Sequence, residues 1–539
     1  MEDKTEQEAE PELFEKGIDL RLATAAVAAW AGVLLGLGFG LRSLLPTVSF
    51  ALITAICALA ASALIALLAR AWSGVAKARP LSWVLTVVIA LSAVVGQSAG
   101  TRFVEDPATT AAKEGSFVTL TLRVSSHPAA PDTPFGQDTR VFKASATSIQ
   151  VGETWVPASA DLWVSLTGFT PQTTNVPVPG AILQVAGALK QEEWLAPPYA
   201  GSFKAASFKE VRSAPPWQVA SSKLRTQLQG AVEPAGINAP LIRGMAIGDD
   251  AGLAKRVKDA MLTSSLTHLT AVSGTHIGVT LAVVVWATRG RPRLQAALAA
   301  GFLAVIVTLV GPAPSVIRAS LTSALAVWAT LRRRPFQPFA LLGAVALGVL
   351  LVSPWLARSL GFALSSAATA GIVLFARPLT TWLTDRLPKE GRARKLLAPV
   401  MAAVAVALTA QISTLFILPF ANPWLPTWGV VANLLVAPIV PLLTLLSVGV
   451  AATCWWAPPL AAVLVKLATP LANWVAGVAL WVADLPFARL PWPEGIRGAL
   501  LSVGIVGFCA LIFRLLRVVK QARRATSSGV SLLRRSDGG

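Results

Sequence analysis

Histidine, cysteine and charged residues are scarce in this chain of 539 residues. It has three histidines and three cysteines, and 14% of its residues are charged while 54% are hydrophobic. Each cysteine lies inside an apolar run, which favours small buried side chains and excludes a disulfide framework or a thiolate metal site. So little charge beside so much apolar surface excludes a soluble globular protein and predicts a polytopic membrane protein.

Apolar runs long enough to cross a bilayer as helices recur along the chain. Three come before residue 100 and nine after residue 267, so we expect about twelve transmembrane helices. Prolines in the stretch 428–483 could break helices into halves. The predicted spans are 22–38, 50–68, 81–99, 268–288, 294–310, 315–331, 337–353, 358–376, 397–419, 428–452, 460–483 and 497–518.

Between residues 101 and 213 the long apolar runs give way to short alternating ones. Such alternation, bounded by proline, glycine, threonine and aspartate, predicts strands at 117–124, 160–166 and 182–187. About five short strands suit a small closed sheet, so we expect an all-β domain resembling an OB barrel. Aromatic side chains there could stack on bases. Acidic residues slightly outnumber basic ones, however, so a structural or gating role stays open beside DNA binding. The aromatic candidates are Trp155, Trp163, Trp194 and Tyr199.

Residues 214–267 carry apolar side chains at helical spacing, with Leu253, Val257 and Met261 on one face and basic residues off it. Two interpretations stay open for this segment. Its helices are either amphipathic helices lying along the membrane surface or ordinary helices packed against the bundle.

Lysine and arginine gather in loops between alternate pairs of spans, as the positive-inside rule describes. The basic segments are 70–79, 289–293, 332–334, 377–395 and 514–535. Placing them in the cytoplasm requires an even number of spans and two cytoplasmic termini, and it puts the β domain outside the cell membrane. The predicted organisation is a cytoplasmic N-terminus (1–20), three spans (21–100), the extracytoplasmic OB-like domain (101–213), interfacial helices (214–267), a helix bundle (268–519) and a basic cytoplasmic tail (520–539).

Polar side chains inside apolar runs are costly in lipid, so they are the candidate functional groups. Two of the three histidines, His268 and His276, open the run 268–288 together with hydroxyls and glycines. Two histidines are too few for a metal site, which leaves pore lining or a structural, capping role. Arg318 either snorkels at an outer helix end or contacts phosphate through its planar fork. The candidate path residues are His268, Ser273, Thr275, His276, Ser315, Arg318, Gln411 and Asn433.

Four blocks of sequence, in this order, resemble the ComEC family of DNA-uptake channels. The first holds Gly244, Gly248 and Asp249, followed by the run from His268 to His276. The Ala-Val-Ser-Gly-x-His core of that run and the later Pro-Ser-x-x-Arg together make the resemblance specific. The blocks are Gly244, Gly248 and Asp249 with His268-Leu269-x-Ala271-Val272-Ser273-Gly274-x-His276; Gly311-x-x-Pro314-Ser315-Val316-Ile317-Arg318-Ala319; Ser353-Pro354 with Gly361-Phe362-x-Leu364-Ser365; and Gln411 to Pro419 with Ala432-Asn433-Leu434-Leu435-x-Ala437-Pro438-x-x-Pro441.

The resemblance implies an inner-membrane channel that passes single-stranded DNA into the cytoplasm during natural transformation. Many members carry a further metallo-β-lactamase-like domain, whose His-x-His-x-Asp-His cluster is missing from this sequence. We therefore expect no enzyme activity, no metal and no cofactor, and a separate nuclease. Two alternatives from other classes stay open: a secondary transporter for a small anionic solute, and a non-transporting assembly protein.

The sequence also lacks the Gly-x-x-x-x-Gly-Lys-Ser/Thr motif of a P-loop ATPase. The force for import must then come from a cytoplasmic DNA translocase or helicase, acting with strand-binding proteins. An outer DNA receptor and membrane lipid complete the expected partners.

Overall fold

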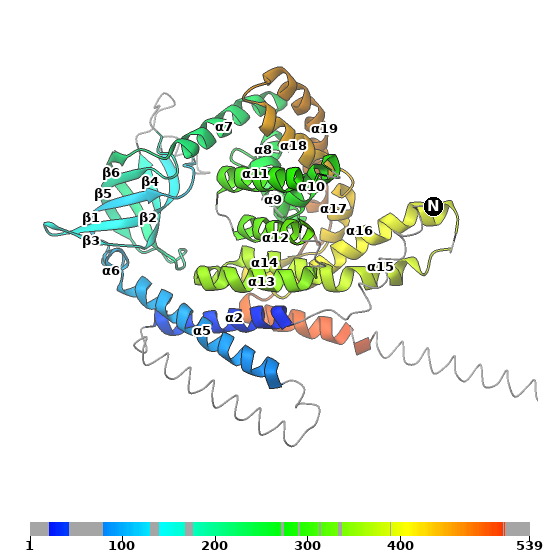
Figure 1. Ribbon diagram of the computed structural model, residues 1–539, viewed down its shortest axis with the longest axis horizontal. Helices are drawn as coiled ribbons and strands as arrows, with labels where there is room; N and C mark the ends of the chain where they lie inside the picture. The colour runs from blue at the N-terminus through cyan, green and yellow to red at the C-terminus, as the bar shows by residue number, and fades with distance from the viewer. Residues whose placement is uncertain are drawn as a thin grey trace, which may run out of the picture.

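The computed structural model describes a helical bundle with a small β domain at one end (Figure 1). The predicted N-terminal segment (1–20), the second span (50–68) and the tail (520–539) lie outside the described residues. The described residues are 21–42, 79–129, 139–167, 176–270, 274–288, 291–311, 314–331, 337–388, 390–509 and 511–512.

The β domain is a closed ring of five strands with a sixth strand added to it. β1 pairs with both β5 and β2, and the ring runs β1–β5–β6–β4–β2 and back to β1, while β3 pairs with β2. The β4–β6 pair is parallel and the others are antiparallel. Closure leaves the ring without a free edge. The strands are β1 (Phe117–Val124), β2 (Thr139–Val151), β3 (Thr154–Pro157), β4 (Asp161–Thr167), β5 (Ile182–Lys190) and β6 (Tyr199–Arg212), which confirms the three segments predicted from alternation.

Alternate side chains of these strands fill the interior of the ring. Leu120, Leu122 and Val124 of β1 are all buried. The helix α6 (Pro107–Glu114) adds its alanine face to the same core. Asp106 caps this helix by accepting a hydrogen bond from the Ala108 amide, and its other oxygen accepts from Ser159. The β domain therefore has a hydrophobic core of its own.

The first two described helices, α2 (Arg21–Leu41) and α5 (Arg79–Glu105), pack with their backbones almost in contact. Glycines at four-residue spacing on α2 make this approach sterically possible. A Cβ atom added at Gly36 would lie 1.9 Å from the Ala93 carbonyl oxygen of α5. α2 also packs against α13 (Pro338–Val352).

Three helices connect the β domain to the bundle: α7 (Pro216–Val232), α8 (Ala239–Ile247) and α9 (Lys255–Thr263). Their apolar side chains, including Leu253, Val257 and Met261, are buried in one core with α18 and α19. The apolar faces of these helices therefore pack against the bundle. Their position relative to a membrane surface stays a prediction.

Six helices of the described chain are long and apolar enough to cross a bilayer, and α17 with α18 makes a seventh if this bent pair crosses once. Four shorter apolar helices coincide with the predicted spans 268–288, 315–331, 337–353 and 497–518. The total of twelve spans stays a prediction. The remaining bundle helices are α10 (Gly274–Ala287), α11 (Pro292–Val310), α12 (Pro314–Leu331), α14 (Leu360–Gly371), α15 (Arg377–Thr384), α16 (Arg392–Thr414), α17 (Gly429–Val436), α18 (Val440–Thr453) and α19 (Pro458–Ala483).

Two of the spans are irregular. α17 and α18 meet at an angle of 61°, and Pro438 and Pro441 at the break remove two amide donors, as expected from the sequence. Five residues of π-helix, Ile372–Ala376, join α14 to α15. Short elements complete the described chain: 3-10 turns at Glu233–Ala235, Thr267–Leu269, Pro354–Arg358 and Leu418–Phe420, and the paired strands β7 (Trp424–Pro426) and β8 (Arg489–Pro491).

Candidate path and its mouth

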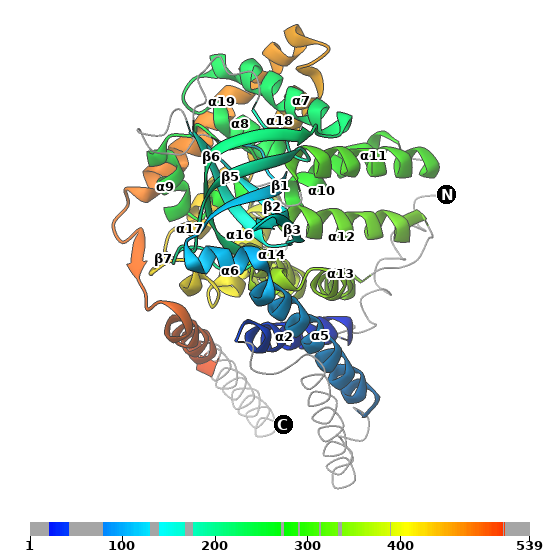
Figure 2. The ribbon, with the colours of Figure 1, turned by 90° about the vertical axis from the view of Figure 1, so that its left-hand side faces the viewer.

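A cavity of about 2100 Å³ lies between the β domain and the helix bundle. Figure 2 looks at the molecule from the β-domain side, so that the β domain lies in front of the bundle. One wall comes from β2, β4 and neighbouring loops, and the other from α7, α8 and the ends of α11 and α13. Its charged lining is six basic residues against four acidic ones, namely Arg140, Lys143, Lys223, Arg225, Arg243 and Arg358 against Asp161, Glu233, Asp249 and Asp250.

Lys143 and Tyr199 line the β-domain side of the cavity, and Tyr199 belongs to a cluster of aromatic rings. The ring of Trp163 lies edge-on to Trp194 and Tyr199, at centroid distances of 6.1 and 6.3 Å. Lys143 Nζ lies 5.3 Å from the centre of the Tyr199 ring. Three of the four predicted aromatic residues therefore gather at one place, whereas Trp155 lies on β3 with an exposed indole.

A carboxyl group sits beside these rings at the start of β4. The Ser145 hydroxyl donates to Asp161 Oδ1 at 2.6 Å. Burial raises the pKa of Asp161, and the Ser145 hydrogen bond and Lys143 partly oppose that rise. The β domain thus offers a stacking surface (Tyr199), a cation (Lys143) and a hydrogen-bond acceptor (Asp161) to the cavity.

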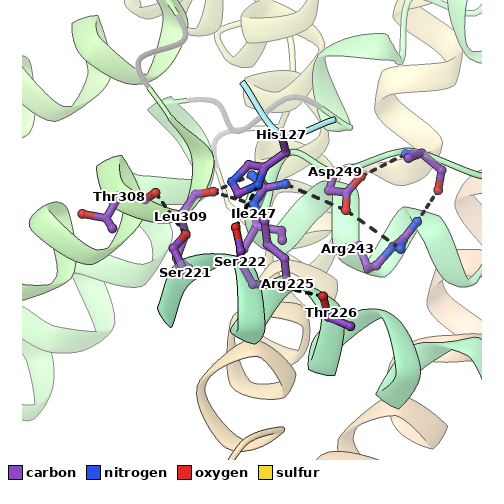
Figure 3. A network of polar contacts seen from close by, with 11 residues as sticks. His127, Ser221, Ser222, Arg225, Thr226, Arg243, Ile247, Asp249, Thr308 and Leu309 are labelled. Atoms are coloured by element: carbon purple, nitrogen blue, oxygen red, sulfur yellow. Dashed lines mark hydrogen bonds and ion pairs between the residues drawn. The ribbon is translucent and has the colours of Figure 1, made fainter. Parts of the chain in front are cut away.

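A network of polar contacts joins the β domain to the mouth of the bundle (Figure 3). His127, from the loop after β1, lies with Nδ1 3.3 Å from the Ser222 hydroxyl of α7. One turn further along α7, Arg225 Nε donates to the Leu309 carbonyl at 2.8 Å and Nη2 donates to the Ile247 carbonyl. A cation placed at these last-turn carbonyls complements the dipoles of α8 and α11. Burial, assisted by the charge of Arg225, lowers the pKa of His127 to about 4.

Asp249 lies between two arginines in the same network. Its Oδ2 is 3.9 Å from Arg225 Nη1 and 3.9 Å from Arg243 Nη1. Gly248, which precedes it, ends α8 in the left-handed conformation at φ 70°. Arg243 also donates to the Ala251 carbonyl. The Gly-Asp pair that belongs to the family motif is therefore the point where α7, α8 and α11 meet.

Arg318 is buried near the start of α12, with 5% of its surface exposed. Its Nε and Nη2 both donate to the hydroxyl of Ser365 on α14, at 3.1 and 2.5 Å. A Cβ atom added at Gly274 of α10 would lie 3.8 Å from Nη2. Within the described chain no carboxylate comes within ion-pair distance of this guanidinium. Three sequence blocks of the family pattern thus converge on one uncompensated buried cation.

A second polar group surrounds the start of α17. Gln411 Nε2 donates to the Pro426 carbonyl at 3.0 Å, and Asn433 Nδ2 donates to the Gly429 carbonyl at 2.8 Å. His268 Nδ1 lies 3.0 Å from the carbonyl oxygen of Ser265. A Cβ atom added at Gly429 would lie 2.9 Å from Gln411 Oε1 and 3.0 Å from Ser265 Cβ. Both amide side chains therefore turn toward protein backbone next to the turn that carries His268.

The remaining predicted residues lie around these two groups or outside the described chain. His276 of α10 is buried. Thr275, Pro314 and Ser315 lie in the first turns of α10 and α12, Gly361 begins α14, and Pro438 lies between α17 and α18. Ala271, Val272 and Ser273 lie outside the described residues. No group of three metal-ligating side chains occurs among the residues that the structure describes.

Sequence reasoning missed the arginines of the network and Ser365 as a partner of Arg318. Arg225 and Arg243 lie in a segment of amphipathic helices, where basic residues usually belong to a solvated face. The signal that could have found Arg243 is its place inside α8, where every neighbour from Leu241 to Ile247 is apolar or glycine. Arg225 lacks such a signal, because polar residues surround it in sequence.

The fold and the polar groups define a polytopic helical membrane protein with a separate β domain over a polar mouth. The family model described as "Competence protein" matches residues 245–518, just over half of the chain. The chain therefore belongs to the competence protein family of ComEC type, and this membership indicates a role in DNA uptake during transformation. No curated protein and no solved structure matches the chain.

Proposed function

We propose that this protein is the inner-membrane channel that carries single-stranded DNA into the cytoplasm during natural transformation. The observation that carries the proposal is the buried, uncompensated guanidinium of Arg318, held at one edge by Ser365. A charge left unpaired in an apolar bundle is strongly destabilising. A phosphodiester passing Arg318 would supply the missing negative charge.

The cavity supports an entry site for the strand next to the β domain. Its basic residues outnumber its acidic ones, and base stacking on Tyr199, which lines it, needs no particular sequence. The β-ring order β1–β2–β4–β6–β5, with its parallel β4–β6 pair, supports assigning an OB-like fold. In this assignment the barrel holds bases while the helical wall faces phosphates.

The arrangement of the bundle supports an extracytoplasmic β domain. α11 and α13 end beside the cavity, at Gly311 and Ser353. Their first residues, next to the basic segments 289–293 and 332–334, lie at the opposite end of the bundle. The positive-inside rule places those segments in the cytoplasm. The barrel is then outside, both termini are cytoplasmic, and an outer receptor delivers DNA to it. A cytoplasmic helicase or translocase and strand-binding proteins draw the strand inward.

Replacing Arg318 tests the channel. In a naturally competent host we expect Arg318→Ala to lower transformation by about tenfold to a hundredfold, the value of one to two charge-assisted contacts. The abundance of the protein in the membrane should not change. Lys466→Ala is the matched control, because Lys466 is an exposed cation on the spanning helix α19.

His276→Ala should follow Arg318→Ala, since both side chains are buried beside the same helix pair. If either variant is less abundant in the membrane than the wild type, the replaced residue has a structural role instead. Normal transformation after deletion of the gene would contradict the channel.

The bend between α17 and α18 favours one other candidate, a secondary transporter with a midplane site at a broken helix. That protein would move a small anion and leave DNA uptake unchanged on deletion, so the same deletion strain separates the two functions.

A further inference from the structure

Two arginines on the helical wall of the cavity share a single carboxylate. The side chains of Arg225 and Arg243 are 14% and 6% exposed, and that of Asp249 is 21% exposed. Both ion-pair distances are 3.9 Å, longer than the 2.7–2.9 Å typical of a direct charge-assisted hydrogen bond. Two positive charges facing one negative charge leave a net positive charge at this point of the wall.

Each guanidinium is held by backbone oxygens independently of Asp249. Arg225 donates to the carbonyls of Leu309 and Ile247, and Arg243 donates to that of Ala251. Arg243 Nε is buried and has no hydrogen-bond partner in the described structure. These contacts would keep both arginines in place if the carboxylate moved away.

The segment that carries Asp249 is a turn rather than a helix. It runs from Gly248 to Gly252, and both glycines have positive φ, 70° and 81°. Among the described residues, Asp249 Oδ1 accepts a hydrogen bond only from the Ala251 amide of the same turn, at 3.2 Å. The carboxylate can therefore leave the arginines through a rotation of its own side chain, without displacing α8 or α11.

We propose that Arg225 and Arg243 form a phosphodiester-binding site in which Asp249 takes the place of the phosphate until a strand arrives. An entering phosphodiester exchanges with the carboxylate between the two guanidiniums. Each guanidinium offers its Nη1 to the anion, while other donors of the same group hold backbone oxygens. This inference rests on the proposed function and names the first phosphate contact along the route. Arg225 caps the C-terminal end of α11, and α11 leads through Gly311 into α12. Arg318 lies near the start of α12, so the end of α11 that Arg225 caps is close to Arg318 along the chain.

Strand affinity of two neighbouring aspartate variants tests the exchange. The full chain, purified in detergent, would be titrated with a short fluorescent oligodeoxythymidylate while anisotropy is recorded over a range of salt concentrations. Asp249→Asn should bind on the order of threefold to tenfold more tightly than the wild type, because the internal competitor is gone. The slope of log K against log salt should stay the same, because the wild type makes the same phosphate contact once Asp249 has left.

Asp250→Asn is the matched control. It removes the same charge from the next residue of the same cavity wall, but no ion pair or hydrogen bond joins Asp250 to either arginine in the described residues. We expect it to bind like the wild type. Equal tightening in both variants, or weaker binding by Asp249→Asn, would overturn the exchange.

A third variant, Asp249→Glu, tests the exchange if Asp249→Asn fails to fold. Asp249→Glu keeps the charge and adds one methylene, which brings the carboxylate into direct contact with the arginines and should weaken strand binding severalfold. Binding equal to or tighter than that of the wild type would overturn the exchange. Failure of the folded wild-type chain to bind any strand would overturn the proposed function together with this site.

Discussion

A buried charge needs a charge of opposite sign or a set of hydrogen bonds. The polar residues of this bundle differ in which of these two kinds of partner they have. Gln411 and Asn433 are satisfied by backbone carbonyls, so their burial is explained without a ligand. Arg318 has a hydroxyl as its side-chain partner and no carboxylate within the described chain. This contrast makes Arg318 the strongest candidate contact for an anion and the amides the weaker ones.

Ser365 and Ser366 offer a test of that contrast within one helix turn. Ser365→Ala removes the hydroxyl that fixes the guanidinium of Arg318, so we expect transformation to fall by about fivefold to tenfold, as for loss of one charge-assisted hydrogen bond. Ser366→Ala removes a buried hydroxyl that has no hydrogen-bond partner among the described residues. We expect it to leave transformation and thermal stability unchanged or slightly improved. Equal losses from both variants would argue against a positioning role for Ser365.

At the residue scale, rarity and the cost of polar groups in lipid selected His268, His276 and Arg318 from the sequence. The structure places His268 in a 3-10 turn, His276 in the first turn of α10 and Arg318 near the start of α12, and their roles stay predictions. The partners of Arg318 and Asp249 could not be predicted. Arg318 and Ser365 are 47 residues apart, and only the packing of α12 on α14 brings them together.

At the scale of elements, the close pair α2–α5 is the clearest consequence of sequence. Glycines on α2 recur every four residues and lie against the backbone of α5, which side chains of any size would prevent. We expect Gly36→Leu to separate these helices and to lower the free energy of unfolding by about 1–3 kcal/mol or more. Urea unfolding of the purified protein would measure this change in the free energy of unfolding.

Gly38→Leu is the control on the same helix. A Cβ at Gly38 meets nothing within 4 Å, so the same chemical change should be nearly neutral. Leu is a better helix former than Gly, so a loss at Gly36 alone would come from packing against α5. If both substitutions cost the same, close packing against α5 would not explain the loss.

Periodicity predicted most elements because it depends on local burial. Strands at 117–124 and 182–187 coincide with β1 and the first residues of β5, and the prolines near residue 440 mark the bend between α17 and α18. Closure of the β ring was expected, whereas the strand order within it could not be predicted. Order depends on contacts between distant segments, such as the parallel pairing of Asp161 to Leu166 with Tyr199 to Ala205.

For the whole molecule, the decisive feature is that barrel, cavity and polar bundle lie in series. α7 is the chain connection from the barrel to the later helices, and the His127–Ser222 contact is a second attachment from a different part of the barrel. Together with the chain connection through α5 and α6, this contact fixes the barrel over the mouth more firmly than α7 alone could. A change that weakens the second attachment should therefore loosen the barrel without unfolding it.

Acid should weaken that attachment through His127. Burial and the nearby Arg225 hold its pKa at about 4, below the ordinary 6.5, while Asp249 opposes this shift. Because the docked state binds the proton less well, its full stability is present above pH 6.5. It is lost progressively as the pH falls toward about 4, below which no further loss comes from this group. The protection factors of the α7 amides, which are exchange rates corrected for the pH dependence of the unprotected amide, should fall over this window in the wild type. In His127→Gln, which keeps a polar side chain but cannot titrate, the protection factors should change less between pH 6.5 and about 4. An identical pH profile in the two proteins would assign the acid response to carboxylates elsewhere.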